Sequence, residues 1–157
     1  MERFLNSNED AALWMWLSRT RDAIIRTRER ELRQYNISCI QSTAMMIIQA
    51  LGDKATPAEI SRWAFRESQS VSELLNRMEK EGLVKKIKDL DRRNMVRVVL
   101  TERGLEAYRQ TQKYEMVHKV MSSLSATERK QLRNALKKVW DRALEELESG
   151  IRPPFPG

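Results

Sequence analysis

The stretch that decides the fold runs from residue 68 to residue 101 and reads SQSVSELLNRMEKEGLVKKIKDLDRRNMVRVVLT. Its first part predicts a helix over residues 68–81, because apolar residues recur there at steps of three and four. Its second part predicts a β-hairpin with strands at residues 83–87 and 95–100, both rich in β-branched residues, around a polar, charged turn. A further helix is expected at residues 57–64. A helix-turn-helix followed directly by a hairpin is the arrangement of a winged helix.

Helical patterns continue on both sides of this unit. They predict helices over residues 9–35, 38–50, 102–123 and 126–148. Three helix starts carry Ser or Thr followed three residues later by Glu or Gln, the signature of a capping box. These starts are at Ser38, Thr56 and Ser125. The expected fold class is therefore mainly α with a small β-hairpin wing.

The helices at the two ends of the chain carry apolar stripes that a small winged unit cannot cover. The stripe of the last helix consists of Leu132, Leu136, Val139, Ala143 and Leu147. Such faces are most simply buried against each other and against a second copy of the chain. We therefore expect residues 1–37 and 105–157 to form a helical dimerisation region, and residues 38–104 to form a winged helix-turn-helix DNA-binding domain.

The chain has 157 residues, with 29 Lys and Arg against 22 Asp and Glu, and a formal net charge of +7. The longest uninterrupted apolar run, residues 44–48, is far below the ~20 residues of a membrane-spanning helix, and the first ten residues lack the pattern of a signal peptide. One Cys and one His cannot supply four zinc ligands. We expect a cytoplasmic protein without metal, cofactor or membrane partner. Its positive charge favours an anionic partner.

The helix over residues 68–81 has a polar face opposite its apolar one. The polar residues that we assign to DNA recognition are Gln69, Ser70, Ser72, Glu73, Asn76 and Arg77. Asn and Gln pair with adenine and Arg with guanine in the major groove. Glu73 would either accept a hydrogen bond from cytosine or orient Arg77. An ordinary solvated helix face is the structural alternative.

The predicted hairpin is strongly basic, with a charge of +4 between Lys85 and Arg97. An arginine at the tip of a wing can enter an adjacent minor groove, where narrow A·T-rich stretches concentrate negative potential. We assign the wing contacts to Lys88, Arg92 and Arg93, with Asp91 orienting one guanidinium through an ion pair. A solvated charged turn is the alternative, and the residues alone leave open which of the two arginines is at the tip.

Four segments of this region together resemble the MarR family of bacterial transcriptional regulators. They are TPAEIS (56–61), SVSELLNRMEKEGLV (70–84), KDLDRR (88–93) and VVLTERG (98–104). The resemblance implies a homodimer with interleaved chain ends that binds double-stranded DNA at a pseudo-palindromic operator. It also implies a repressor released by a small effector, which in this family is often an aromatic carboxylate. By position, the six polar residues above would face the major groove.

One departure from the family concerns the turn of the helix-turn-helix. The family usually has glycine or another small residue where this chain has Phe65, so we expect the turn to be formed by residues 64–67. A rival function of a different class is a winged-helix protein-interaction module without DNA affinity. An enzyme is disfavoured, because His118 lacks a partner in any catalytic constellation and the chain has no Gly-rich phosphate loop.

Two arginines of the first helix, Arg21 and Arg28, fall within its apolar stripe. Buried arginines need partners. They either form salt bridges to carboxylates of the last helix or the partner subunit, or they form an anion-binding effector pocket. The residues of that candidate pocket are Trp14, Arg21, Arg28, Met45, Met46 and Tyr108.

Cys39 is the single cysteine and lies in the first turn of a predicted helix. The helix macrodipole lowers the pKa of a thiol at this position. A regulator that senses oxidants through Cys39 is therefore a further alternative, and a small buried residue is the structural interpretation.

Overall fold

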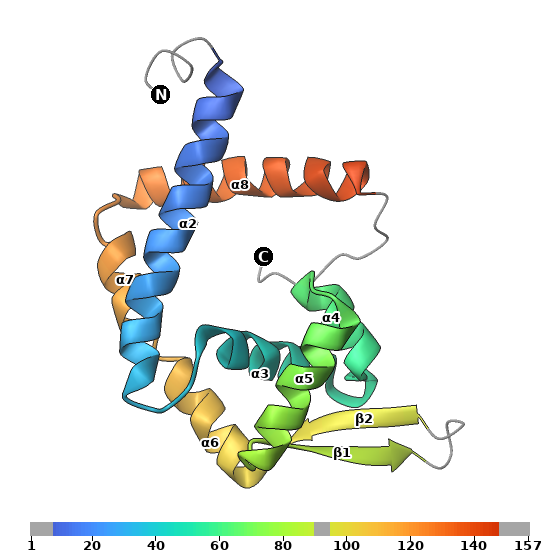
Figure 1. Ribbon diagram of the computed structural model, residues 1–157. Helices are drawn as coiled ribbons and strands as arrows, with labels where there is room; N and C mark the ends of the chain where they lie inside the picture. The colour runs from blue at the N-terminus through green and yellow to red at the C-terminus, as the bar shows by residue number, and fades with distance from the viewer. Residues whose placement is uncertain (1–7, 90–94, 148–157) are drawn as a thin grey trace.

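The computed structural model describes residues 8–89 and 95–147 (Figure 1). In chain order the elements are α2 (Glu9–Arg33), α3 (Cys39–Leu51), the short 3₁₀ helix η1 (Gly52–Lys54), α4 (Pro57–Ala64), α5 (Ser68–Lys80), β1 (Val84–Asp89), β2 (Met95–Leu100), α6 (Glu102–Thr111), α7 (Glu115–Met121) and α8 (Ala126–Glu146). The helices and the single antiparallel hairpin confirm the expected fold class. The capping boxes at Ser38 and Ser125 are complete, whereas the carboxylate of Glu59 pairs with Arg62 instead of Thr56.

The hairpin follows α5 directly, as expected for a wing. Strand β1 pairs antiparallel with β2, with Val84 opposite Leu100 and Asp89 opposite Met95, so β1 is two residues longer at its end than the pattern predicted. The N–H of Val98 also donates to the carbonyl of Ala55 at 2.8 Å. This hydrogen bond anchors β2 to the segment before α4.

The hydrophobic core lies within residues 37–98, between α3, α4, α5 and the hairpin. Met45, Leu75 and Met78 are fully buried there. Helix α6 packs so closely on this unit that a Cβ atom added to Gly104 would lie 1.9 Å from the carbonyl oxygen of Leu83. Only glycine fits at this contact, so Gly104 serves packing and not a helix end.

The turn between α4 and α5 follows the expected course. Helix α4 ends at Ala64, Phe65 takes left-handed backbone angles with φ 50°, and α5 begins at Ser68. The hydroxyl of Ser61 donates to the carbonyl of Arg66 at 2.6 Å and closes the turn. The ring of Phe65 contacts Trp140 of α8 edge to face, with centroids 5.5 Å apart.

The prediction of a single helix over residues 102–123 is wrong, because two helices, α6 and α7, occupy this segment. Tyr114 adopts left-handed angles at the break, with φ 50°. The carboxylate of Glu31 on α2 accepts the N–H groups of Glu115 at 2.9 Å and Met116 at 3.3 Å. Because a residue of α2 satisfies the free N–H groups that start α7, the break costs little. The helical periodicity of residues 102–123 does not indicate this contact, because Glu31 lies 84 residues before Glu115 in the sequence.

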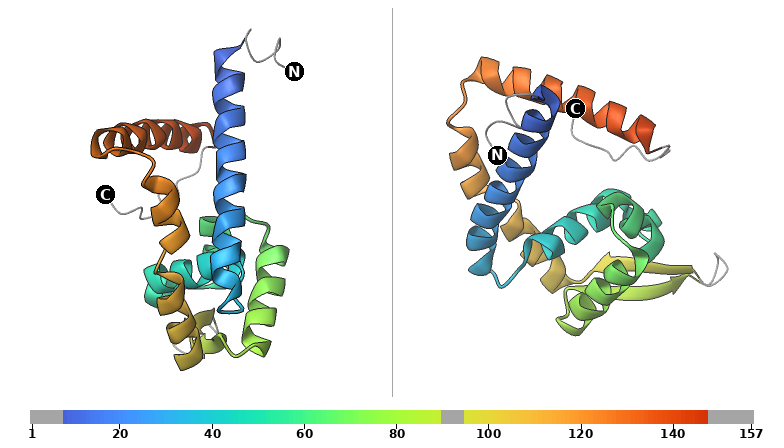
Figure 2. Two further views of the ribbon diagram at one scale, coloured as in Figure 1. Left: turned by 90° about the vertical axis from the view of Figure 1, so that its left-hand side faces the viewer. Right: turned by 45° about the horizontal axis from the view of Figure 1, so that its top comes forward.

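The long helices α2 and α8 extend beyond the winged unit, and α8 lies on the side of the molecule away from the hairpin (Figures 1 and 2). The first half of α2 exposes large apolar side chains, with Trp14 68% and Trp16 74% exposed. The apolar stripe of α8 is also exposed, including Leu132, Leu136 and Val139. The two terminal helices therefore present apolar surface that the described residues, 8–89 and 95–147, do not cover.

Candidate nucleic-acid interface

Helix α5 has one buried face and one polar face. Its buried residues are Val71, Leu74, Leu75 and Met78. All six residues assigned to recognition are exposed, namely Gln69, Ser70, Ser72, Glu73, Asn76 and Arg77. The apolar face holds the helix on the core and leaves its side-chain donors and acceptors directed away from it, an arrangement suited to a groove of DNA.

Two of these residues are partly engaged with each other. The amide of Gln69 donates to the carboxylate of Glu73, one turn later, at 3.3 Å. The sequence predicts either a cytosine or Arg77 as the partner of Glu73, whereas the hydrogen-bond partner of Glu73 in the structure is Gln69. Glu73 thus limits the negative charge it presents by accepting from a neighbour on the same face.

Asn76 contacts the wing strand. The ammonium of Lys86, on β1, donates to Oδ1 of Asn76. The carboxylate of Glu79 accepts the backbone N–H of Lys86 at 3.0 Å and lies 3.6 Å from its ammonium. Lys86 therefore joins the candidate recognition helix to the wing. Sequence reasoning missed this role, because the contact depends on how β1 packs against α5 and no local pattern signals it.

The wing is only partly within the described residues. Lys88 is exposed on β1, where a phosphate can reach it, and Arg97 on β2 pairs with Asp53 of η1. Arg97 and Lys86 therefore already have partners in the chain, which reduces the free positive charge of the hairpin. The assigned residues Asp91, Arg92 and Arg93 lie outside the described residues.

Arg28, assigned to a candidate effector pocket, is built into the fold. Its guanidinium pairs with Glu31 at 2.8 Å, donates to the carbonyl of Thr111 and lies 4.3 Å from the ring centroid of Tyr114. The expected salt bridge to the last helix is thus wrong for Arg28, because its carboxylate partner lies one turn away on α2. Burial acts to raise the pKa of Glu31, but hydrogen bonds from Arg28, Glu115 and Met116 outweigh it and hold that pKa below its ordinary value of 4.5.

The other residues of that candidate pocket lie at different depths. Met45 is part of the core, Tyr108 packs against the core, and Met46 is exposed. Trp14 is exposed, and Arg21 is also exposed, paired with Asp22 at 3.3 Å. Their part in binding a ligand stays a prediction.

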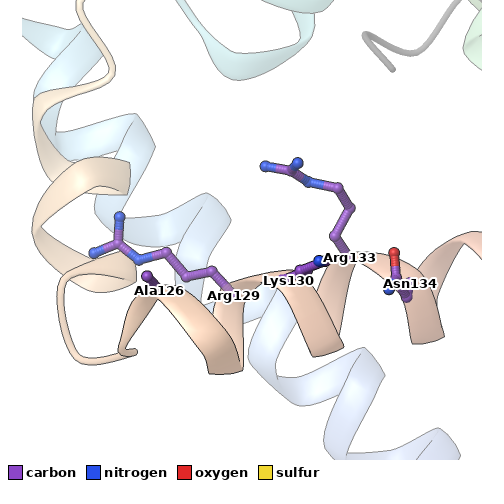
Figure 3. A pocket seen from close by; sticks show the side chains of 5 residues that line it. All are labelled: Ala126, Arg129, Lys130, Arg133 and Asn134. Atoms are coloured by element: carbon purple, nitrogen blue, oxygen red, sulfur yellow. The ribbon is translucent and has the colours of Figure 1, made fainter.

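A shallow hollow occurs elsewhere, along the first turns of α8 (Figure 3). Its lining residues are Ala126, Arg129, Lys130, Arg133 and Asn134. The side chains of Arg129 and Arg133 extend away from α8 in different directions (Figure 3). It shares no residue with the predicted effector pocket.

Cys39 is half-buried, and its thiol lies 3.7 Å from the carbonyl of Ile25. Burial, followed by the negative charge of Glu29, raises the pKa of the thiol. The expectation that the helix start lowers this pKa is therefore wrong. A raised pKa keeps sulfur in the less reactive thiol form, which disfavours oxidant sensing.

Within residues 8–89 and 95–147, no cluster of three His, Cys, Asp or Glu residues could hold a metal ion. In the same described part of the chain, no helix is long and apolar enough to cross a membrane.

Comparison with known proteins gives a match over the winged unit. Residues 40–104 match the family model of the winged helix DNA-binding domain. No curated protein matches the chain. The matched segment spans α3 to the start of α6, including α5 and the hairpin. Fold, exposed polar helix and matched domain together define a winged-helix DNA-binding protein.

Solved structures extend the likeness to nearly the whole chain. The organohalide-sensing RdhR-CbdbA1625 transcriptional regulator, bound to 2,4-dichlorophenol, is 28% identical with a TM-score of 0.85, over 96% of this chain and 91% of that one. A MarR family protein from Bacillus stearothermophilus is 26% identical with a TM-score of 0.68, over 87% and 97%. A mutant MarR from E. coli in complex with operator DNA shares the fold at 21% identity and a TM-score of 0.77, over 84% and 96%. The chain therefore contains a winged helix DNA-binding domain and is similar over most of its length to transcriptional regulators, among them a MarR family protein.

Proposed function

We propose that this regulator binds a specific operator through the polar face of α5, with the wing contacting the flanking DNA. The observation that carries the proposal is the exposure of all six polar residues of that face, directly beside a basic hairpin strand. Arg77 and Gln69 supply hydrogen-bond donors for base edges, and Lys88 supplies positive charge for a phosphate.

A selection from a random duplex library tests this proposal, followed by affinity measurements on the selected sequence. Arg77→Ala should weaken operator binding by about tenfold or more, as expected for the loss of a base contact. Arg109→Ala is the matched control, since it removes an exposed arginine of α6 that pairs with Glu106. Equal affinity for all sequences and no salt dependence would favour the protein-interaction module instead.

We further propose that the protein is a homodimer held by α2 and α8. Support comes from the large apolar side chains that these helices expose within one chain.

Helix α8 is also charged unevenly along its length. Residues 128–138 carry Arg129, Lys130, Arg133, Lys137 and Lys138 against Glu128, and residues 139–146 carry Asp141, Glu145 and Glu146 against Arg142. Two copies paired antiparallel about a two-fold axis would set the basic segment of one helix against the acidic segment of the other. Sedimentation equilibrium at several concentrations tests the dimer, and a monomer at all of them would refute it.

The third part of the proposal is repression relieved by a small aromatic effector. A related regulator, 28% identical, has been solved with bound 2,4-dichlorophenol. We infer that this chain accepts a phenol or aromatic acid near Trp14, Met46 and Tyr108. Arg21 would bind an anionic group, because its ion pair with Asp22 is exposed to solvent, whereas the ion pair of Arg28 with Glu31 is buried. Titration of the operator complex with 2,4-dichlorophenol should release DNA. Unchanged DNA affinity at saturating phenol would exclude this ligand class.

A further inference from the structure

The contact between Lys86 and Asn76 has a consequence for how the protein selects bases. Lys86 lies on β1, and Asn76 lies on the exposed face of α5. The ammonium of Lys86 donates to Oδ1 of Asn76 and lies 3.6 Å from a carboxylate oxygen of Glu79. One lysine thus sits between two side chains of the recognition helix.

Glu79 fixes where that lysine can be. One carboxylate oxygen of Glu79 accepts the backbone N–H of Lys86 at 3.0 Å, so β1 is held against the end of α5 through its main chain. The other oxygen faces the ammonium of the same residue. Because backbone and side chain of Lys86 are both held, its ammonium stays near Asn76 without depending on a flexible side chain alone.

The chemistry of the ammonium fixes the amide of Asn76. An ammonium group has only donors, so the atom of Asn76 that faces it must be the carbonyl oxygen. The amide nitrogen then points away from Lys86, with both of its hydrogens as donors. Asn76 and Lys86 together present donors, and the acceptor of Asn76 is already engaged.

We propose that Lys86 is a specificity-determining residue, which makes Asn76 act as a hydrogen-bond donor and select guanine over adenine. The inference rests on the proposed operator binding by α5. Adenine needs an acceptor and a donor from an Asn, because it presents N6–H₂ beside N7. Guanine presents two acceptors, O6 and N7, which match a donor surface. The nearby positive charge strengthens this preference and opposes the amino group of cytosine.

The experiment measures base preference at one position. An operator is first selected from a random duplex library with the wild-type protein, and the base pair whose substitution no longer matters in Asn76→Ala is identified. Affinities for all four base pairs at that position are then compared in the wild type and in Lys86→Met, which keeps the apolar stem and removes the ammonium. The wild type should prefer guanine by roughly tenfold, and Lys86→Met should lose this preference or shift it to adenine.

Lys85→Met is the matched control. Lys85 is the neighbouring residue of β1 and points to the opposite face of the strand, where it is exposed. Its loss should leave the guanine preference intact, even if overall affinity falls. Equal thermal midpoints for the three proteins exclude unfolding as the cause.

The outcomes separate this inference from the function on which it rests. If no sequence is enriched in the selection, base reading by α5 fails and the inference fails with it. If an operator is enriched but the wild type prefers adenine at the Asn76 position, or Lys86→Met keeps the wild-type preference, the role of Lys86 is overturned and operator binding stands. If Asn76→Ala changes the base preference at no position of the selected operator, the role of Lys86 is likewise overturned and operator binding stands.

Discussion

Helices α5 and α8 both carry an apolar stripe at helical spacing and bury it to different extents. On α5, Leu75 and Met78 are fully buried by neighbouring elements of the same chain. On α8, Leu136 is 41% and Val139 57% exposed. The comparison teaches that periodicity identifies the apolar face of a helix but not the molecule that covers it. Elements of the same chain bury the apolar face of α5, whereas the apolar stripe of α8 stays exposed among the described residues.

The largest expected effect lies in the winged unit. Leu75→Ala removes a fully buried side chain and leaves a cavity, so it should lower the free energy of unfolding by about 2–5 kcal/mol. Urea unfolding of dilute protein measures the change. Leu132→Ala on α8 is the control, and should cost less than about 1 kcal/mol under the same conditions. Equal losses would contradict the contrast between the two helices.

The stripe of α8 should instead govern association. Leu136→Ala combined with Val139→Ala should raise the dissociation constant of the dimer by about tenfold or more, because apolar residues at the centre of an interface carry much of its binding energy. Sedimentation equilibrium measures the constant. Gln131→Ala, also exposed on α8, should leave it unchanged. If both proteins associate like the wild type, another surface holds the dimer.

The hydrogen bonds from the start of α7 to Glu31 of α2 should make the free energy of unfolding depend on pH. The pKa of Glu31 is lowered in the folded chain, so its carboxylate stabilises the fold above pH 4.5 and this contribution is lost as the pH falls below that value. Glu31→Gln should cost about 1–3 kcal/mol at pH 7. The difference between wild type and variant should shrink between pH 5 and about pH 3. A constant difference in urea midpoints over this range would refute the role of the charge.

The smallest expected effect concerns Phe65, which links the turn to α8. Phe65→Gly relieves the left-handed backbone, worth about 1 kcal/mol, and loses the ring contact with Trp140, worth about the same, so stability should hardly change. Phe65→Ala loses the ring and keeps the unfavourable backbone, so it should cost about 1 kcal/mol. Thermal unfolding compares the two. If Ala and Gly behave alike, the backbone angle of Phe65 carries no cost.

Much of the winged unit is predictable from local chemistry. The apolar stripe of α5, the β-branched strands and the complete capping boxes at Ser38 and Ser125 are patterns within a few residues of each other, and the structure confirms all of them. The turn at Phe65 was also expected in its observed place. The paired state of Arg97 was not, because its partner Asp53 lies 44 residues earlier.

The same limit explains the errors at the candidate sites. The raised pKa of Cys39 comes mainly from burial of the thiol, which the residues next to Cys39 in the sequence do not indicate. The break at Tyr114 comes from Glu31, and Asn76 is engaged by Lys86 of the wing. Each of these effects arises only when two helices or strands pack against each other.

The amino-acid sequence by itself determined the elements, the polar face of α5 and the likeness to a family, because these depend on residue types at short spacings. Only the tertiary structure decided which charged groups are already paired and which apolar faces remain open. Arg28, a candidate ligand for an effector, became part of a buried ion pair with Glu31, and Lys86, one basic residue among several, became the link between recognition helix and wing. The physical reason is that pairing and burial depend on distances in space, which chain spacing does not specify.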